Sequence, residues 1–412
     1  MAQPPGIHAR RAALQMLDAV LRRGETLEQA EGPALRQVRK PADKALARAI
    51  ANETLRWLVD LDALIDSATK QILPEDAKVR SVLRLMLAQW LRLQTPPHAV
   101  IATGLPLLAG GPRRLAHGVF STLNKGEVSL PAYPTLPHAV HVRWGNRADA
   151  IGTGLAEPPP LDLALRDADE TRHWANQLAG DSLAPGHLRL PRGEAIESLG
   201  GFAEGAWWVQ DLAASLPARL LGEGKNRHAL DLCAAPGGKT LQLAAAGWTV
   251  TALDISKRRL SLLKDNLKRT GLSASTIRAD ALTWEPKHRF DAILLDAPCT
   301  ATGTCRRHPD VLHRIGSRQI AEMSELQSAM IARAGGWLNP GGVLVYAVCS
   351  LEREEGEEQA AQVELQPYPI TAEELPAGLT PTAEGWGRTD PGMLTEQGGL
   401  DGFFIGRWRA PS

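Results

Sequence analysis

Hydrophobic positions follow two different periods in the two parts of the chain. Over residues 8–125, apolar side chains recur every three or four positions, as they do on amphipathic helices. No segment there alternates between apolar and polar residues like a strand, so we predict a helical bundle. The predicted helices cover residues 7–23, 41–66, 78–94, 98–109 and 113–124.

From Trp207 onward, short apolar runs alternate with helical segments. The predicted strands cover residues 228–233, 249–254, 275–279, 290–296 and 342–348, and the predicted helices cover residues 238–246, 256–270 and 318–335. This alternation is typical of an α/β fold with a doubly wound, mostly parallel sheet. The last apolar run, 402–409, is expected to add an antiparallel strand at or near an edge.

A chain of 412 residues is too long for one ordinary core, so we expect more than one domain. Several prolines between residues 130 and 140 indicate a linker. The sequence therefore predicts an all-α domain over 1–130, a linker and small α+β lobe over 131–205, and a Rossmann-like domain over 206–412.

Composition and charge narrow the class of protein. Hydrophobic residues make up 44% of the chain and charged residues 22%, which is typical of a globular protein. Neither a membrane-spanning run nor a signal peptide is recognisable, and the four cysteines form no disulfide framework, so we expect a cytoplasmic protein with no membrane partner. The first 130 residues hold 18 lysines and arginines against 12 acidic residues. Such an excess suits a polyanionic partner, and solvated helix faces explain it equally well.

The segment DLCAAPGGKT, residues 231–240, ends a predicted strand and opens a helix. Gly237 and Gly238 permit a tight turn, after which free N–H groups of the helix face an anion. The spacing fits neither a dinucleotide-binding motif nor a P-loop, and it suits a carboxylate such as that of S-adenosylmethionine. Asp254 ends the next strand, where an acid suits ribose hydroxyls, and Asp280 follows the third strand, within reach of an adenine amino group.

Cys299 and Cys349 each end or follow a later apolar strand. Because strand carboxyl ends gather over one crevice in a doubly wound sheet, we expect both thiols to share a site with the glycine loop. A nucleophilic thiolate needs a nearby cation or helix N-terminus to lower its pKa. Lys239 and a helix expected to begin near residue 352 are candidates for that role.

These groups suit methylation of a pyrimidine carbon. A thiolate that adds to carbon 6 of cytosine makes carbon 5 nucleophilic, and a carboxyl group at nitrogen 3, such as that of Asp296, stabilises the adduct. The second thiol then serves removal of the carbon 5 proton, directly or through water. Zinc is the competing interpretation, and its ligands would be Cys299, Cys305, His308 and His313. Their spacing matches no common zinc finger, so we predict no metal.

Basic clusters near these motifs are candidate nucleic-acid contacts. Arg306 and Arg307 follow the Cys299 loop closely, where they are expected to hold phosphates of a flipped-out nucleotide. A basic stripe over 257–269 and the arginine pairs at 10–11 and 113–114 add further positive charge. For these others, solvated surface is an equally simple explanation.

The motifs together carry a resemblance that covers nearly the whole chain. They are WVQDLAA (208–214), DLCAAPGGKT (231–240), ALDIS (252–256), RADA (278–281), DAPCTATGTCRRHPD (296–310), YAVCS (346–350) and DGFF (401–404). With them the chain resembles the RNA 5-methylcytosine methyltransferases, and the RRHPD run resembles their RsmB/Fmu-type branch, which modifies small-subunit ribosomal RNA. Residues 8–125 resemble the NusB-like helical RNA-binding domain of that branch.

The resemblance implies roles for individual residues. Cys349 would be the nucleophile, Cys299 would assist product release, and Lys239 would touch the active centre as well as the cofactor. The residues that would hold S-adenosylmethionine are Cys233, Ala234, Ala235, Pro236, Gly237, Gly238, Lys239, Asp254, Asp280 and Asp296.

The leading hypothesis is therefore S-adenosylmethionine-dependent methylation of cytosine carbon 5 in small-subunit (16S) ribosomal RNA, by a monomer. One alternative keeps the chemistry and takes transfer RNA as substrate. Another is a non-catalytic RNA-binding assembly or antitermination factor that works through residues 8–125. The complete set of Cys299, Cys349, Asp296 and the glycine loop argues against the latter.

Overall fold

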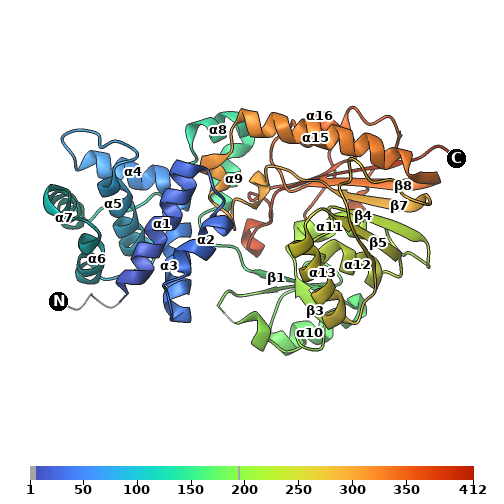
Figure 1. Cartoon of the computed structure of the whole chain (residues 1–412), viewed down its shortest axis with the longest axis horizontal. Coiled ribbons are helices and arrows are strands. Elements are labelled where there is room, and N and C mark those ends of the chain that lie inside the picture. Colours follow the sequence, from blue (N-terminus) through green and yellow to red (C-terminus); the bar gives the residue numbers. More distant parts are fainter. Residues whose placement is uncertain (1–5, 194) are drawn as a thin grey trace. The chain divides into compact units, whose positions relative to one another are not determined.

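The computed structural model describes residues 6–193 and 195–412. These divide into two compact units (Figure 1). One, here called the helical unit, runs to Glu157 and also contains the segment Cys305–Ile315. The other, here called the sheet unit, comprises Pro158–Thr304 and Gly316–Ser412. The three-domain division expected from the sequence places its boundaries differently and stays a prediction.

The helical unit confirms the predicted bundle. Its main helices are α1 (Ile7–Arg23), α2 (Leu27–Leu35), α3 (Pro41–Arg56), α4 (Leu58–Ser67), α5 (Lys78–Leu91), α6 (Pro97–Gly104), α7 (Gly110–Lys125), α8 (His138–Trp144) and α9 (Ala148–Gly154). Helix α5 lies at the centre, against α1, α3, α4, α6 and α7, and it is buried on most faces, as its apolar sequence predicts.

Two local features of this bundle differ from the prediction. The helix expected over 41–66 is interrupted at Trp57, whose backbone leaves the helical region and separates α3 from α4. Helix α2 was not predicted, although its start carries a recognisable signal. The Thr26 hydroxyl accepts a hydrogen bond from the Gln29 N–H, and the Gln29 side chain accepts one from the Thr26 N–H, which together form a capping box.

The sheet unit begins with a small antiparallel sheet in the order β2-β1-β3. Its strands are β1 (Leu161–Leu165), β2 (His187–Leu190) and β3 (Trp207–Val209), with α10 (Thr171–Leu178) between the first two. The strand-like run LDLALR (161–166) is thus confirmed as a strand.

The main sheet has the strand order β10-β11-β8-β7-β4-β5-β6, and β9 (Gln366–Pro367) pairs with β11. The strands β4 to β8 are parallel neighbours, and β11 runs antiparallel between β8 and β10, so the predicted terminal strand is confirmed. Their bounds are β4 (His228–Leu232), β5 (Thr249–Asp254), β6 (Ser275–Arg278), β7 (Phe290–Asp296), β8 (Leu338–Val348), β10 (Gly387–Thr389) and β11 (Phe403–Arg409).

Helices cover both faces of this sheet (Figure 1). Ile293 and Leu295 of β7 pack in one cluster with Met330 of α15 (Ser317–Gly336). Leu294 points to the other face, where it packs with Leu216 of α11 (Leu212–Arg219). On that face α12 (Gly238–Ala245) and α13 (Lys257–Thr270) continue the layer, so buried parallel strands explain the continuous apolar runs in the sequence.

The remaining elements are short. They are α14 (Val311–Arg314), α16 (Glu357–Ala360) and the 3₁₀ turns Leu105–Leu107, Gly145–Arg147, Ala168–Glu170, Ile196–Ser198, Thr302–Thr304, Ala372–Glu374 and Thr395–Gln397. Among the described helices, none combines the length and apolarity that crossing a membrane requires.

Candidate active site

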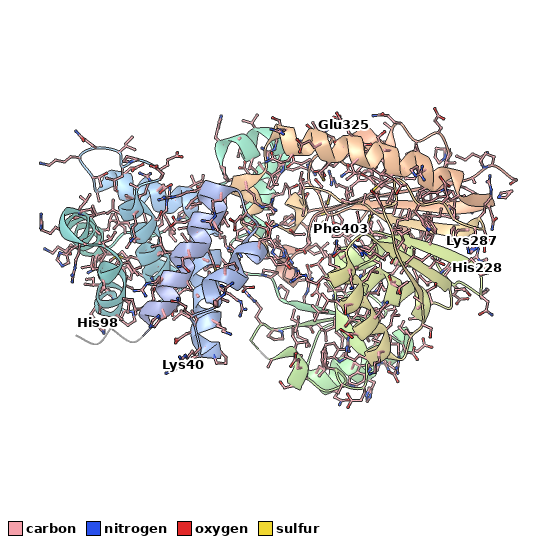
Figure 2. All side chains as sticks on the ribbon, in the orientation of Figure 1. Lys40, His98, His228, Lys287, Glu325 and Phe403 are labelled. Atoms are coloured by element: carbon pink, nitrogen blue, oxygen red, sulfur yellow. The ribbon has the colours of Figure 1, made fainter. Side chains whose placement is uncertain are left out.

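The carboxyl ends of four parallel strands are level with one another. In the sheet register, Leu232 of β4 lies beside Leu253 and Leu295, and Asp296 of β7 lies beside Ala347. The residues that follow these positions therefore emerge at one edge of the sheet. In Figure 2, His228 at the start of β4 marks the opposite end of the sheet from Phe403.

The loop after β4 has a backbone that glycine makes possible. Gly237 has a φ of 112°, and a Cβ built there would lie 2.2 Å from the Leu263 side chain. A side chain at this position would meet both a strained backbone and the packed α13 helix. Cys233 also adopts a positive φ, 61°, at the point where the chain leaves the strand. The loop thus turns sharply and opens α12 at Gly238.

Asp254 connects this loop to the end of β5. Its carboxylate is 2% exposed and accepts hydrogen bonds from the N–H of Ala235 at 3.1 Å and of Ser256 at 2.8 Å. The neighbouring Ala234 N–H donates to the Leu253 carbonyl at 3.0 Å. Pro236 is exposed at the tip of the loop.

Asp280 lies just beyond β6, where its half-buried carboxylate accepts a hydrogen bond from the Leu282 N–H at 2.9 Å. The three consecutive strand ends thus carry the glycine loop, Asp254 and Asp280 in the order that the sequence predicted.

Two ionisable groups of the DLCAAPGGKT segment have raised pKa values. Burial raises the pKa of Asp231 to about 7, and its carboxyl accepts a hydrogen bond from the Thr240 hydroxyl at 2.5 Å. Burial, with the charges of Asp296 and Asp254, raises the pKa of Cys233 to about 12. Cys233 therefore stays a thiol. The sequence pointed to no role for Asp231, because an acid inside an apolar strand gives no signal of its protonation state.

Lys239 joins three elements at the same edge. Its ammonium group lies 2.7 Å from the carboxylate of Asp296 and 5.2 Å from the ring centre of Phe403. The Lys239 side chain is 10% exposed and that of Asp296 is 31% exposed. Asp296 thus faces solvent on one side while Lys239 fixes it from the other.

The two predicted thiols lie together. The Sγ atoms of Cys299 and Cys349 are 3.4 Å apart, and both residues are half-buried. The hydrogen bond to Cys349, together with burial, raises the pKa of Cys299 well above its ordinary value. The helix expected near residue 352 is absent, since α16 begins at Glu357 and has only four residues. That part of the prediction was wrong, because the intervening residues form turns.

The prediction for Arg306 was also wrong. Its side chain is 1% exposed, so it is too buried to hold a phosphate, and its segment belongs to the helical unit. Its segment packs against that unit's helices: Arg56 donates to the Arg306 carbonyl at 2.7 Å, and His313 lies 2.7 Å from the Leu55 carbonyl. Arg307 remains half-buried.

The structure also bears on the Arg10 surface charge and on the zinc ligands considered from the sequence. Arg10 is buried and donates to the Gln89 side chain at 2.7 Å, so it is not a surface charge. Cys305 is fully buried. Within residues 6–193 and 195–412, no three His, Cys, Asp or Glu side chains come together in a way that could hold a metal ion.

Comparison with known proteins agrees with this architecture. Residues 218–409 match the family described as 16S rRNA methyltransferase RsmB/F, and residues 7–107 match the NusB family. The ribosomal RNA small subunit methyltransferase B of Klebsiella pneumoniae is 34% identical over 436 residues, which cover 97% of this chain and 98% of that protein.

Solved structures share the fold. The structure of PH0851 superimposes with a TM-score of 0.72 at 21% identity and covers 99% of each chain. A methyltransferase homologue from Pyrococcus horikoshii is 28% identical with a TM-score of 0.54, and it covers 66% of this chain and 93% of its own.

The fold and the matches to known families define the class of protein. The chain is an S-adenosylmethionine-dependent RNA methyltransferase that carries a NusB-like helical domain. More particularly, the chain belongs to the RsmB/F family of 16S rRNA methyltransferases.

Proposed function

We propose that this protein methylates carbon 5 of a cytosine in small-subunit ribosomal RNA, with Cys349 as the nucleophile and Cys299 as the residue that completes release. The observation that carries the proposal is the pair of thiols 3.4 Å apart, on two loops that leave neighbouring parallel strands. A cytosine ring needs both groups at once, since one adds to carbon 6 and the other serves the adjacent carbon 5.

The electrostatics of the pair support this order of roles. Contact with Cys349 and burial both raise the pKa of Cys299. Cys299 therefore keeps its proton at the start of the reaction, which suits a group that acts at the release step and not as the first nucleophile.

Each step balances in protons and electron pairs. The Cys349 thiolate forms a bond to carbon 6, and the displaced electron pair of the ring makes carbon 5 nucleophilic. Asp296 would share with nitrogen 3 the proton that the adduct needs at that atom, and Lys239 holds Asp296 in place. Bound S-adenosylmethionine supplies the methyl group for carbon 5.

Release follows from the same proximity of the two sulfurs. Once the Cys349 sulfur is bonded to carbon 6, it carries no charge and no longer raises the pKa of Cys299. Cys299 can then give its thiol proton to water and accept the proton of carbon 5, directly or through water. The electron pair of that C–H bond restores the ring double bond and expels the Cys349 thiolate.

The residues around the loop fit the cofactor. One carboxylate oxygen of Asp254 accepts the Ala235 N–H and lies 3.7 Å from the Arg259 guanidinium. The other accepts only the Ser256 N–H among these contacts and would keep a lone pair for a ribose hydroxyl. The start of α12 at Gly238 suits the carboxylate of the methionine part, and Asp280 suits the adenine amino group. Cys233, Ala234, Ala235, Pro236, Gly237, Gly238 and Lys239 would form the loop around it.

Three further expectations belong to the proposal. Lys257, Lys264 and Lys268 are exposed along α13 and are candidate contacts for RNA phosphates. All four cysteines are free thiols, which suits a reducing cytoplasm, and we take the working form to be a monomer.

A trapping experiment tests the assignment. Wild type, Cys299→Ala, Cys349→Ala and the buried control Cys305→Ala are incubated with small-subunit RNA and S-adenosylmethionine, then separated on a denaturing gel. We expect a covalent RNA adduct with Cys299→Ala, none with Cys349→Ala, and methyl transfer without accumulated adduct for wild type and control.

The other outcomes are equally informative. An adduct with Cys349→Ala alone would exchange the two cysteine roles. Methyl transfer to transfer RNA and not to ribosomal RNA would replace the substrate. No transfer to any RNA by wild type would contradict the proposed function.

A further inference from the structure

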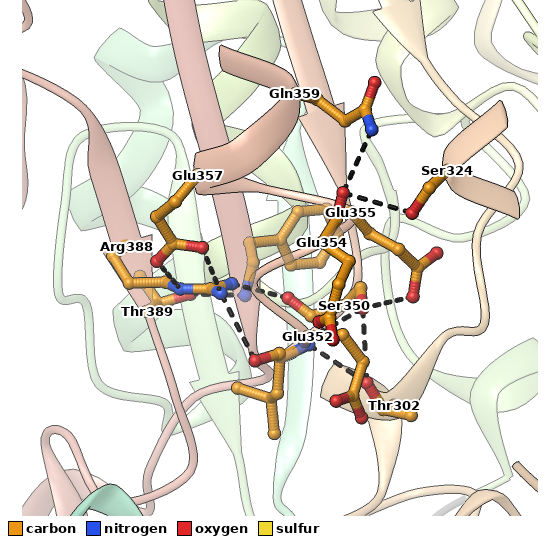
Figure 3. Close-up of polar contacts among 12 residues, drawn as sticks. Thr302, Ser324, Ser350, Glu352, Glu354, Glu355, Glu357, Gln359, Arg388 and Thr389 are labelled. Atoms are coloured by element: carbon orange, nitrogen blue, oxygen red, sulfur yellow. Dashed lines mark hydrogen bonds and ion pairs between the residues drawn. The ribbon is translucent and has the colours of Figure 1, made fainter. Parts of the chain in front are cut away.

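A buried acid lies behind the two thiols, outside the set of residues that the chemistry uses. Glu355 follows β8 in a run of acidic residues, yet its side chain is fully buried. Its backbone is fixed as well, because the Tyr346 hydroxyl donates to the Glu355 carbonyl at 2.5 Å. Figure 3 shows this residue within a network that includes Ser350, Thr302 and Arg388.

The Glu355 carboxylate accepts hydrogen bonds from both cysteine-bearing loops. One oxygen accepts the Thr300 N–H and the Gln327 amide, each at 2.9 Å. The other accepts the Ser350 hydroxyl at 2.7 Å and the Thr300 hydroxyl. Thr300 directly follows Cys299 and Ser350 directly follows Cys349, so one carboxylate connects the residues next to the two thiols.

We propose that Glu355 is a positioning residue, which sets the distance between the Cys299 and Cys349 thiols by holding Thr300 and Ser350 together. Its burial supports this, since a side chain that only solvated an acidic run would be exposed. Four donors converge on a group that only accepts, and a buried carboxylate is stable only with such a set.

The neighbouring Arg388 contacts the Cys349 loop, and it therefore serves as a comparison for Glu355. Its guanidinium donates to the Ser350 carbonyl at 2.5 Å and to the Leu351 carbonyl at 3.3 Å, and it pairs with Glu357 at 2.9 Å (Figure 3). These hydrogen bonds fix the Cys349 loop. Arg388 and Glu355 thus give two variants that disturb the same loop, of which the Glu355 variant also disconnects the two loops from each other.

This inference rests on the proposed function, and it predicts a defect in one step. Of the two thiols, formation of the adduct needs only Cys349, whereas release needs Cys299 at carbon 5 of a ring already bonded to Cys349. Loss of the Glu355 link therefore slows release more than addition. Misplacing a reacting group by about 1 Å costs up to about a hundredfold in rate, so we expect turnover to fall by about ten- to a hundredfold.

The test compares Glu355→Ala with Glu355→Gln, Arg388→Met and the exposed control Glu354→Ala, all with both cysteines intact. Each is incubated with small-subunit RNA and labelled S-adenosylmethionine, and turnover, trapped adduct and melting temperature are measured. We expect Glu355→Ala to accumulate the covalent RNA adduct, Arg388→Met to lose stability without adduct, and Glu354→Ala to match wild type. Glu355→Gln should restore release, because the Thr300 and Ser350 hydroxyls can turn to accept from its amide.

A purely structural role gives a different pattern. Turnover and adduct would then fall together with the melting temperature in Glu355→Ala, and that result would overturn the inference. The Cys299→Ala protein, run beside these variants, separates this failure from failure of the proposed function. Adduct in Cys299→Ala without adduct in Glu355→Ala contradicts only the role of Glu355, whereas absence of methyl transfer in wild type contradicts the function.

Discussion

Both units bury arginine–carboxylate pairs, such as Arg189 with Asp162 in the sheet unit, but the sheet unit also buries acids that face only hydroxyl and amide groups. In the helical unit, buried arginines meet carboxylates directly: Arg84 pairs with Asp62 at 2.7 Å, and Arg56 pairs with Glu53 at 3.1 Å. In the sheet unit, the buried acids Asp231 and Glu355 face hydroxyl and amide groups, and no cation pairs with them in the described part of the chain.

The difference between paired and unpaired buried charges indicates which groups can change their protonation state. A guanidinium beside a carboxylate keeps its charge at every working pH, so such pairs hold helices together and do no proton chemistry. Burial without a cation instead raises the pKa of Asp231 and of Glu355, and the thiol pair does the same for Cys299. Groups of that kind cluster where reactions occur.

The largest effect should come from Asp296, which lies at the solvent side of the proposed site. Asp296→Asn removes the carboxyl group proposed to hold nitrogen 3 of cytosine, and loss of such a catalytic group lowers rates by about 10²–10⁴-fold. The unfolding midpoint should change little, because the asparagine amide oxygen can still accept from Lys239 and the side chain is 31% exposed. Methyl-transfer kinetics measure the effect. Asp291→Asn, the same change near the other end of β7, is the matched control, and full activity in Asp296→Asn would contradict the role.

Arg56 tests whether the buried arginine–carboxylate pairs stabilise the helical unit. Its guanidinium holds Glu53 and the Arg306 carbonyl, and both partners' atoms are buried. Breaking a buried pair by removing one partner costs about 3–5 kcal/mol, so Arg56→Met should lower the free energy of unfolding by about 3 kcal/mol in urea denaturation. Arg48→Met on the same helix breaks an exposed pair with Glu31 and should cost about 1 kcal/mol or less. Equal losses would show that burial does not distinguish the two pairs.

Asp231 tests whether a buried acid without a cation has a raised pKa in the sheet unit. Its pKa of about 7 in the folded chain lies above the unfolded value of about 4, so the folded state binds the proton more tightly. The stability that this proton contributes is complete below about pH 4 and is lost as the pH rises to about 7.

Asp231→Asn removes that dependence. Relative to wild type, it should gain about 2 kcal/mol of unfolding free energy between pH 5 and pH 8. Denaturation at both pH values measures the gain, with the exposed Asp265→Asn as control. A difference between variant and wild type that does not change with pH would contradict the raised pKa.

Much of the fold could be predicted because local patterns and global packing agree. The periods of apolar residues predicted the bundle and the parallel strands, since buried stripes and buried runs are what those elements require. The break at Trp57 could not be predicted, because residues 41–66 carry no glycine or proline after the first position to mark it. Helix α2 has only a short apolar stripe, and its capping box was the one local signal.

The site divides along a similar line. Motifs at strand ends predicted that the two thiols and the glycine loop would share one edge of the sheet, since parallel strands bring their carboxyl ends together. The structure brings Cys299 to Cys349 and Lys239 of that loop to Asp296. Glu355 was missed because the acidic run around it resembles a solvated surface, and burial depends on packing that sequence period does not record. The prediction for Arg306 was wrong for the opposite reason. A basic pair beside a catalytic motif suggests an exposed phosphate contact, whereas the fold buries Arg306 among helices.

The smallest expected effect concerns the exposed charges of the sheet unit. Lys257, Lys264 and Lys268 lie on α13, the helix that packs against the glycine loop, and they are exposed. Replacing all three by alanine should weaken RNA binding about three- to tenfold at 0.1 M salt, and the salt slope should fall by about 0.7 for each phosphate that the protein no longer neutralises. Binding titrations at several salt concentrations measure both, with the exposed Lys287→Ala as control near the far end of the sheet (Figure 2). If the salt slope of RNA binding stays unchanged, these lysines contact solvent and not RNA. The charged groups of the sheet unit that serve its function would then be the buried ones at the strand ends.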